Sequence, residues 1–154
     1  MTKITALSTE ITRRLQNGGL DAHGQPPERA VSDGGGNPCR HCLRHIPKGA
    51  EMLILAHRPF DTAQPYAETG PIFLCADPCT LHDSAALPEM LTNAPDYLIK
   101  GYNGEDRIVY GTGIVIPQAQ MMQQAKAILT DKRVAYVHIR SARNNCYQAR
   151  IDRD

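Results

Sequence analysis

The sequence predicts an α+β fold, in which two helices flank a mostly antiparallel sheet in one compact domain spanning residues 1–154. Most apolar segments are short and bounded by Gly, Pro, Asn or Asp, which is typical of strands joined by turns. Only two segments repeat apolar residues with the period of a helix. A chain of 154 residues is also long enough to bury a core of its own.

The first strand and the first helix are expected near the N-terminus. Residues 3–7 are predicted to form the strand, and Ser8 or Thr9 can cap the helix, which Gly18 then ends. Residues 17–38 are rich in Gly, Pro, Asp and Asn. They are expected to form one long loop, and loops of that length are usually functional or held in place by another part of the protein.

Two apolar segments in the middle of the chain are predicted to be buried strands. They cover residues 51–56 and 71–75, and the second strand ends at a cysteine. The loop between them, residues 59–71, has proline at both ends, which restricts its backbone. We expect Tyr66 and Glu68 of this loop to line a groove.

The C-terminal half is predicted to contain the remaining strands and the second helix. Residues 96–102 and 107–110 are expected to be strands around a turn, followed by a strand at 113–116. Pro117 suits the first turn of a helix, and residues 133–151 are expected to form a hairpin. The apolar face of the helix would consist of Met121, Met122, Ala125, Ile128 and Leu129.

Charge and composition argue against several classes of partner. The 17 basic and 16 acidic residues leave a net charge of +1, so no overall field attracts nucleic acid or a membrane. With no Trp and two Phe, the chain offers few rings on which single-stranded nucleic acid could stack. No segment has the length of a membrane span or of a signal peptide, so we expect a cytoplasmic protein.

Four of the five cysteines form two close pairs, Cys39-Arg-His-Cys42 and Cys75-Ala-Asp-Pro-Cys79. In the reducing cytoplasm such pairs more often bind metal than form disulfides. Two turns that each present two thiolates can complete a tetrahedral zinc site with no open coordination position, so the zinc would be structural. The predicted ligands are Cys39, Cys42, Cys75 and Cys79.

Three alternatives remain open for these cysteines. They could be free buried thiols, because cysteine is among the most commonly buried residue types. Cys39 and Cys42 also have the spacing of a thiol oxidoreductase motif, although the strand that should precede that motif is missing. Finally, His41 or His82 could replace one cysteine as a zinc ligand.

The C-terminal hairpin carries a second candidate site. A loop of residues 141–145 would pair Arg140 with Cys146 and place one polar set of side chains on a single face. Outward faces of antiparallel sheets are normally polar, so a solvated face is the favoured interpretation. The residues of this face would be Tyr136, His138, Arg140, Cys146, Gln148 and Arg150.

The alternative interpretation makes this face an active or anion-binding site. Arg140 and Arg150 would bind a small anion, a carboxylate or a phosphate, through their forked guanidinium groups. His138 would act as a base and Cys146 as a nucleophile. The sequence does not decide whether the protein is an enzyme.

Several segments together resemble a bacterial family of uncharacterised proteins, the domain-of-unknown-function family 1203. The matching stretches are Asn37-Pro-Cys-Arg-His-Cys-Leu43, residues 52–56, Pro65-Tyr-Ala-Glu-Thr-Gly-Pro-Ile-Phe73, residues 131–140 and Ser141-Ala-Arg-Asn-Asn-Cys-Tyr147. The resemblance implies an α+β domain and no established activity. It also implies that Cys75 is often His in near relatives and that distant ones lack the second cysteine of the first pair. A position that accepts Cys or His suits zinc.

The sequence therefore predicts a small cytoplasmic binding module with a structural zinc site. The alternative is an enzyme or anion-binding protein that uses the hairpin face. Metal content and the reactivity of Cys146 would separate the two hypotheses.

Overall fold

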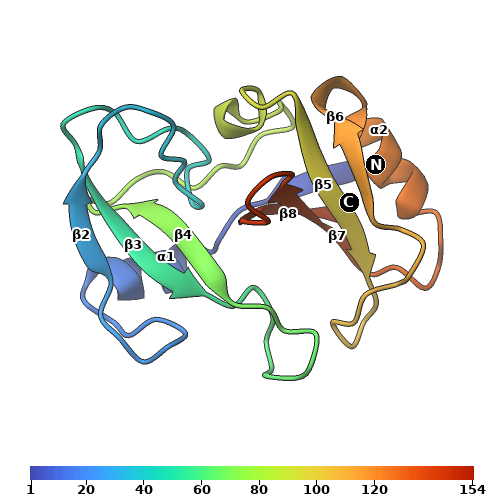
Figure 1. Cartoon of the computed structure of the whole chain (residues 1–154), viewed down its shortest axis with the longest axis horizontal. Coiled ribbons are helices and arrows are strands. Elements are labelled where there is room, and N and C mark those ends of the chain that lie inside the picture. Colours follow the sequence, from blue (N-terminus) through green and yellow to red (C-terminus); the bar gives the residue numbers. More distant parts are fainter.

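The α+β class is confirmed in the computed structural model, which describes all residues, 1–154. The strands form two antiparallel sheets, one of five strands and one of three. Figure 1 shows these sheets as two lobes, each with one α-helix. We call them the five-stranded lobe and the three-stranded lobe.

The five-stranded sheet has the strand order β1-β8-β7-β5-β6. Helix α2 (Met121–Ile128) buries Met121, Ala125 and Ile128 in the core of this lobe, as the apolar period predicts. Its strands are β1 (Thr2–Thr5), β5 (Asp96–Tyr102), β6 (Ile114–Pro117), β7 (Tyr136–Ser141) and β8 (Tyr147–Arg153), and the lobe also contains the short 3-10 helices η1 (Glu89–Leu91) and η2 (Gln118–Gln120).

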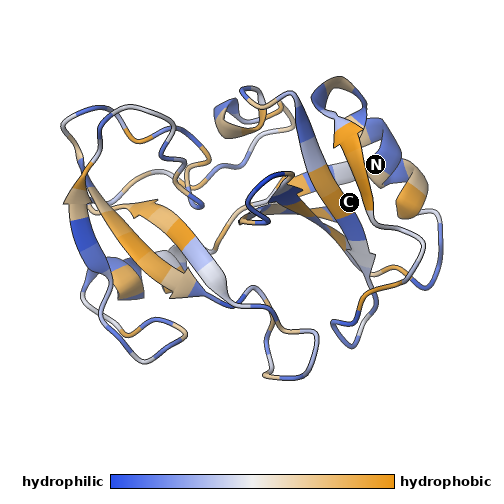
Figure 2. Ribbon diagram, in the orientation of Figure 1, coloured by the Kyte–Doolittle hydropathy of each residue, from blue (hydrophilic) through white to orange (hydrophobic).

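The three-stranded sheet has the order β2-β3-β4 and packs with helix α1 (Thr9–Gln16). The expected helix cap is confirmed, because the Ser8 side chain accepts a hydrogen bond from the amide of Ile11. Strand β3 is mostly hydrophobic along its length (Figure 2). The strands are β2 (Glu28–Val31), β3 (Glu51–His57) and β4 (Gly70–Cys75).

Two predicted elements differ from the structure. Residues 17–38 are not one loop, because they contain β2, a short strand that is mostly exposed and carries little apolar pattern. Residues 107–110 form a single bridge between Tyr102 and Ile108 and no strand. Asn103 and Val109 still donate their amide hydrogens across this turn, but the amide hydrogen of Gly101 is accepted by the hydroxyl of Thr112 in place of a backbone carbonyl.

The predicted pairing of Arg140 with Cys146 is wrong. Arg140 lies opposite Tyr147, His138 lies opposite Arg150, and a β-bulge interrupts the register after Ile139. The loop closes when Ser141 donates its amide hydrogen to the carbonyl of Cys146, which leaves Cys146 outside β8. Asn145 makes this loop in a left-handed conformation (φ 57°), which asparagine tolerates better than most residues.

The prediction of a solvated hairpin face is also wrong. His138 is fully buried among aromatic rings, and the ring of Phe60 lies 5.1 Å from its imidazole. Phe60 belongs to the segment that follows β3, so a part of the chain distant in sequence covers this face. The other buried members are Tyr136, Arg140 and Gln148.

None of the helices has the length and apolar character needed to cross a membrane.

Candidate functional site

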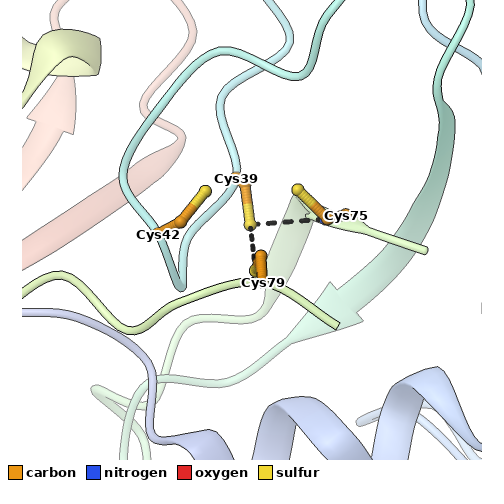
Figure 3. A group of neighbouring side chains, drawn as sticks. All are labelled: Cys39, Cys42, Cys75 and Cys79. Carbon is orange, nitrogen blue, oxygen red and sulfur yellow. Dashed lines mark hydrogen bonds between the residues drawn. The ribbon is translucent and has the colours of Figure 1, made fainter. Parts of the chain in front are cut away.

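The four predicted zinc ligands converge on one point. The sulfur atoms of Cys39, Cys42, Cys75 and Cys79 all lie within 4.8 Å of one another, and none of these cysteines is in a disulfide (Figure 3). The Sγ atoms of Cys39 and Cys79 are 3.8 Å apart. Four sulfurs placed tetrahedrally about 2.3 Å from a zinc ion would be separated by about 3.8 Å. The cluster therefore has the size of a four-thiolate metal site.

The first cysteine pair lies on a tight turn between Pro38 and His45, which form a short antiparallel bridge. Cys39 donates its amide hydrogen to the carbonyl of Arg44 and accepts one from Leu43 through its own carbonyl. Leu43 adopts a left-handed conformation (φ 56°), which is uncommon for a residue other than glycine. We call residues 38–45 the cysteine turn.

The second pair comes from the end of β4. Cys75 is the last residue of that strand, and its amide hydrogen is donated to the sulfur of Cys39 at 3.3 Å. Such backbone donors spread the negative charge of a thiolate and orient it. Helix α1 supports the segment that follows, because Gln16 donates to the carbonyls of Cys75 and Asp77.

His41 lies beside the cluster as a hydrogen-bonding partner of a sulfur. Its Nδ1 atom is 3.1 Å from the sulfur of Cys79, and its Nε2 atom is 2.9 Å from the hydroxyl of Thr9. Burial lowers the pKa of His41, which favours the neutral ring with one N–H. If Thr9 donates to Nε2, the Nδ1 proton can be donated to the sulfur. This arrangement resembles the supporting contacts that orient metal ligands.

The four thiols compete for negative charge. Hydrogen bonding with Cys42 lowers the pKa of Cys39, and hydrogen bonding with Cys39 raises the pKa of both Cys75 and Cys79. Ionising one sulfur therefore makes the next harder to ionise, because like charges repel at this distance. A bound divalent cation would remove that conflict, since metal ligation stabilises the thiolate form.

The cysteine turn also joins the two lobes. Leu43 is fully buried in the core of the five-stranded lobe, whereas Cys39 is fully buried in the core of the three-stranded lobe. Arg40 donates from Nε to the carbonyl of Tyr147, at the start of β8. Its backbone carbonyl accepts the amide hydrogen of Leu7, which follows β1. A metal held by the four cysteines would fix this turn to the three-stranded lobe. The turn would then carry the contact with the other lobe through Leu43 and Arg40.

A cavity of about 200 Å³ lies between the lobes, beside the hairpin loop. The structure brings two of the four hairpin candidates, Arg140 and Cys146, to its wall. His138 does not line the cavity, and Arg150 pairs with Asp152 at 2.7 Å.

Two further residues of this cavity come from other parts of the chain. Glu68 lines it, as expected for a groove residue, and its carboxylate lies between Lys100 (3.1 Å) and Arg140 (3.4 Å). Tyr66, in contrast, makes a hydrogen bond to Tyr110 and does not line this cavity. His57 also lines this cavity, although its only sequence signal is its position at the end of a buried strand.

The burial of His138 predicts a specific response to acid. Burial, and then the nearby Arg140, lower the pKa of His138 well below its usual value of 6.5, and neither ring nitrogen has a hydrogen-bonding partner. Below pH 6.5, the histidine of the unfolded chain binds a proton that buried His138 of the folded protein does not. The free energy of unfolding therefore rises with pH between pH 5 and pH 7. From pH 7 to pH 5, wild type should lose up to about 2 kcal/mol of unfolding free energy that His138→Phe does not lose.

Urea unfolding at the two pH values measures this difference, and any loss caused by protonation of cysteines is common to both proteins. His23→Asn, at an exposed position, is the matched control and should behave like wild type. Equal losses in wild type and His138→Phe would contradict the prediction.

The fold and the cluster together define a class: an α+β protein with a four-cysteine centre that could hold a metal ion. A family model described as "Protein of unknown function (DUF1203)" matches residues 36–153. The chain therefore belongs to this family, as the sequence resemblance indicated. A comparison with curated proteins found no match, and a comparison with solved structures found none either.

Proposed function

We propose that this protein is a small cytoplasmic binding module whose lobes are held together by a structural zinc ion. The ligands would be Cys39, Cys42, Cys75 and Cys79. The observation that supports the proposal is the convergence of four sulfurs, from a tight turn and from the end of a strand, without a disulfide.

Zinc suits this donor set better than other common metals of the cell. Thiolates are soft ligands that favour zinc or iron over magnesium and calcium, and zinc accepts four of them tetrahedrally without redox chemistry. Four protein ligands would leave no position for a substrate, so the ion would not be catalytic. A reducing cytoplasm would keep the thiols available for the metal.

Metal analysis of protein purified without added metal or chelator tests this proposal. We expect about one zinc per chain in wild type and less than half of that in Cys75→Ser, because three thiolates bind the ion more weakly. His82→Asn is the matched control and should keep its zinc, since His82 does not belong to the four-sulfur cluster. Wild-type protein without metal, or with iron in place of zinc, would overturn the proposal.

A second candidate function, anion binding, concerns the cavity between the lobes. Of the four residues of this alternative, Arg140 and Cys146 line the cavity, whereas His138 and Arg150 do not. This supports anion binding at Arg140 alone, without Arg150 as a second anion ligand or His138 as a base. The ligand of the module would then bind there, away from the metal.

A further inference from the structure

Arg140 has two hydrogen-bond donors without a partner. Its side chain is 4% exposed, and its Nη1 atom faces Glu68 at 3.4 Å and donates to the carbonyl of Asn145 at 3.2 Å. The remaining donors, Nε and Nη2, are buried and make no hydrogen bond within the protein. Leaving donors of a buried charged group unpaired is costly. Arg140 also lines the cavity, and an acceptor bound there would remove this cost once the side chain shifts to uncover these two nitrogens.

The shape of the unpaired edge suits a carboxylate. Nε and Nη2 lie side by side in the plane of the guanidinium group and offer two parallel N–H bonds. This is the fork that binds the two oxygens of a carboxylate in bidentate pairs. Lysine could not make the same contact, because its ammonium group is a point charge.

The charges around the cavity favour a ligand with one negative charge. Glu68 is shared by Lys100 and Arg140, so two cations face one carboxylate and one positive charge remains. Burial lowers the pKa of His57 to about 4, so this neighbour is neutral at pH 7. Arg40 lines an adjoining groove and already donates to the carbonyls of Pro38 and Tyr147. A dianion would add a second charge beside Glu68 and be repelled.

We infer that this cavity binds a small monocarboxylate, held by the Nε–Nη2 edge of Arg140 beside Cys146. The inference rests on the proposal that the protein is a binding module, and it gives that module a ligand class. The cavity measures about 200 Å³, which is less than the roughly 300–1,000 Å³ of pockets that hold drug-sized ligands. The ligand is therefore a carboxyl group with a short chain.

The thiol of Cys146 allows a direct test. Iodoacetate and iodoacetamide react with a thiolate in the same way: a C–S bond forms, the C–I bond breaks and iodide leaves. They differ in that iodoacetate carries a carboxylate. Binding of that group at Arg140 should raise the ratio of the two alkylation rates at Cys146 about tenfold over the ratio in the free peptide of residues 144–150. This peptide is also the tryptic fragment between Arg143 and Arg150, and it contains no other cysteine.

Two variants and one competition experiment complete the test. Arg140→Gln should lower the ratio to that of the free peptide, whereas Arg150→Gln should leave it unchanged, because Arg150 does not line the cavity. In wild type, sodium acetate should slow the reaction of Cys146 with iodoacetamide, and sodium chloride at equal ionic strength should not. The competition requires no variant and therefore holds even if Arg140→Gln fails to fold.

Each remaining outcome would overturn the inference. A wild-type ratio equal to that of the free peptide would exclude carboxylate binding beside Cys146. Stronger protection by inorganic phosphate than by acetate would show that the ligand class is wrong. A failed carboxylate test would not change the measured zinc content, and protein without zinc could still show the raised ratio of alkylation rates. The two proposals can therefore fail independently.

Discussion

With zinc bound as proposed, replacing Cys39 with serine is expected to release the ion and to lower the free energy of unfolding by at least about 4 kcal/mol. Cys39 is fully buried and lies near the three other sulfurs of the cluster. Its sulfur also accepts the amide hydrogen of Cys75. A serine hydroxyl is a poorer metal ligand than a thiolate, and its C–O bond is shorter than the C–S bond. The contact with the metal and the hydrogen bond from Cys75 would therefore be lost together. Binding energy of a structural zinc ion is folding energy.

Urea unfolding of the purified variant, with and without added zinc, measures this loss. Cys146→Ser is the matched control, because it removes the one cysteine outside the cluster and should change stability by less than about 0.5 kcal/mol. A chelator should destabilise wild type and leave Cys39→Ser unchanged. Equal stability of wild type and Cys39→Ser would show that the centre does not support the fold.

Arg40→Met should destabilise the protein by about 3 kcal/mol, because the guanidinium group connects the cysteine turn to β8. Arg40 is 3% exposed and donates to the carbonyls of Tyr147 and Pro38, each at 2.8 Å. Methionine fills a similar volume but donates no hydrogen bond, so two carbonyls would lose their partner. Such losses cost about 1–3 kcal/mol for each buried group.

The matched control for Arg40 is Arg143→Met, an exposed arginine paired with Asp96. Surface pairs of this kind contribute at most about 1 kcal/mol, so this variant should remain close to wild type. Thermal and urea unfolding would both report the difference. An Arg40→Met protein as stable as the Arg143→Met protein would mean that the contact between turn and strand does not hold the lobes together.

The cysteine cluster could be predicted because its signal is local. Two residues separate the cysteines of the first pair and three separate those of the second, which restricts the sulfurs of each pair to one side of a turn. The apolar strand before Cys75 fixes where that residue lies. The long-range step, bringing the two pairs together, follows from the preference of metal sites for four ligands. The role of His41 as a partner of Cys79 was not predicted, since it depends on where α1 places Thr9.

The hairpin was predicted as an element, but its register was not. Alternation of polar and apolar residues fixes the register only when one face is dry and the other is wet. Here the segment containing Phe60 buries the polar face as well, so the pattern misleads. A bulge after Ile139 then shifts the partner of Arg140 by one residue. Neither feature is visible in the residues of the hairpin itself.

The cavity could be predicted only in part, for the same reason. Arg140 and Cys146 were candidates because they are polar groups on a predicted hairpin, and Glu68 was expected in a groove. Their meeting depends on how the two lobes pack, which no local pattern encodes. Two donors of Arg140 without partners became evident only in three dimensions.

The pairing of β1 with β8 determines the order in which the chain can fold during synthesis. Thr5 lies opposite Arg150, so β1 finds its neighbour only after β8 has been synthesised. The four cysteines of the cluster, in contrast, are all present once Cys79 has been added. We therefore expect the segment that carries the cysteine cluster to fold early, while β1 keeps an unpaired edge until β8 has been added. Contacts between such distant segments form slowly, and closure of the larger sheet should limit the rate of folding.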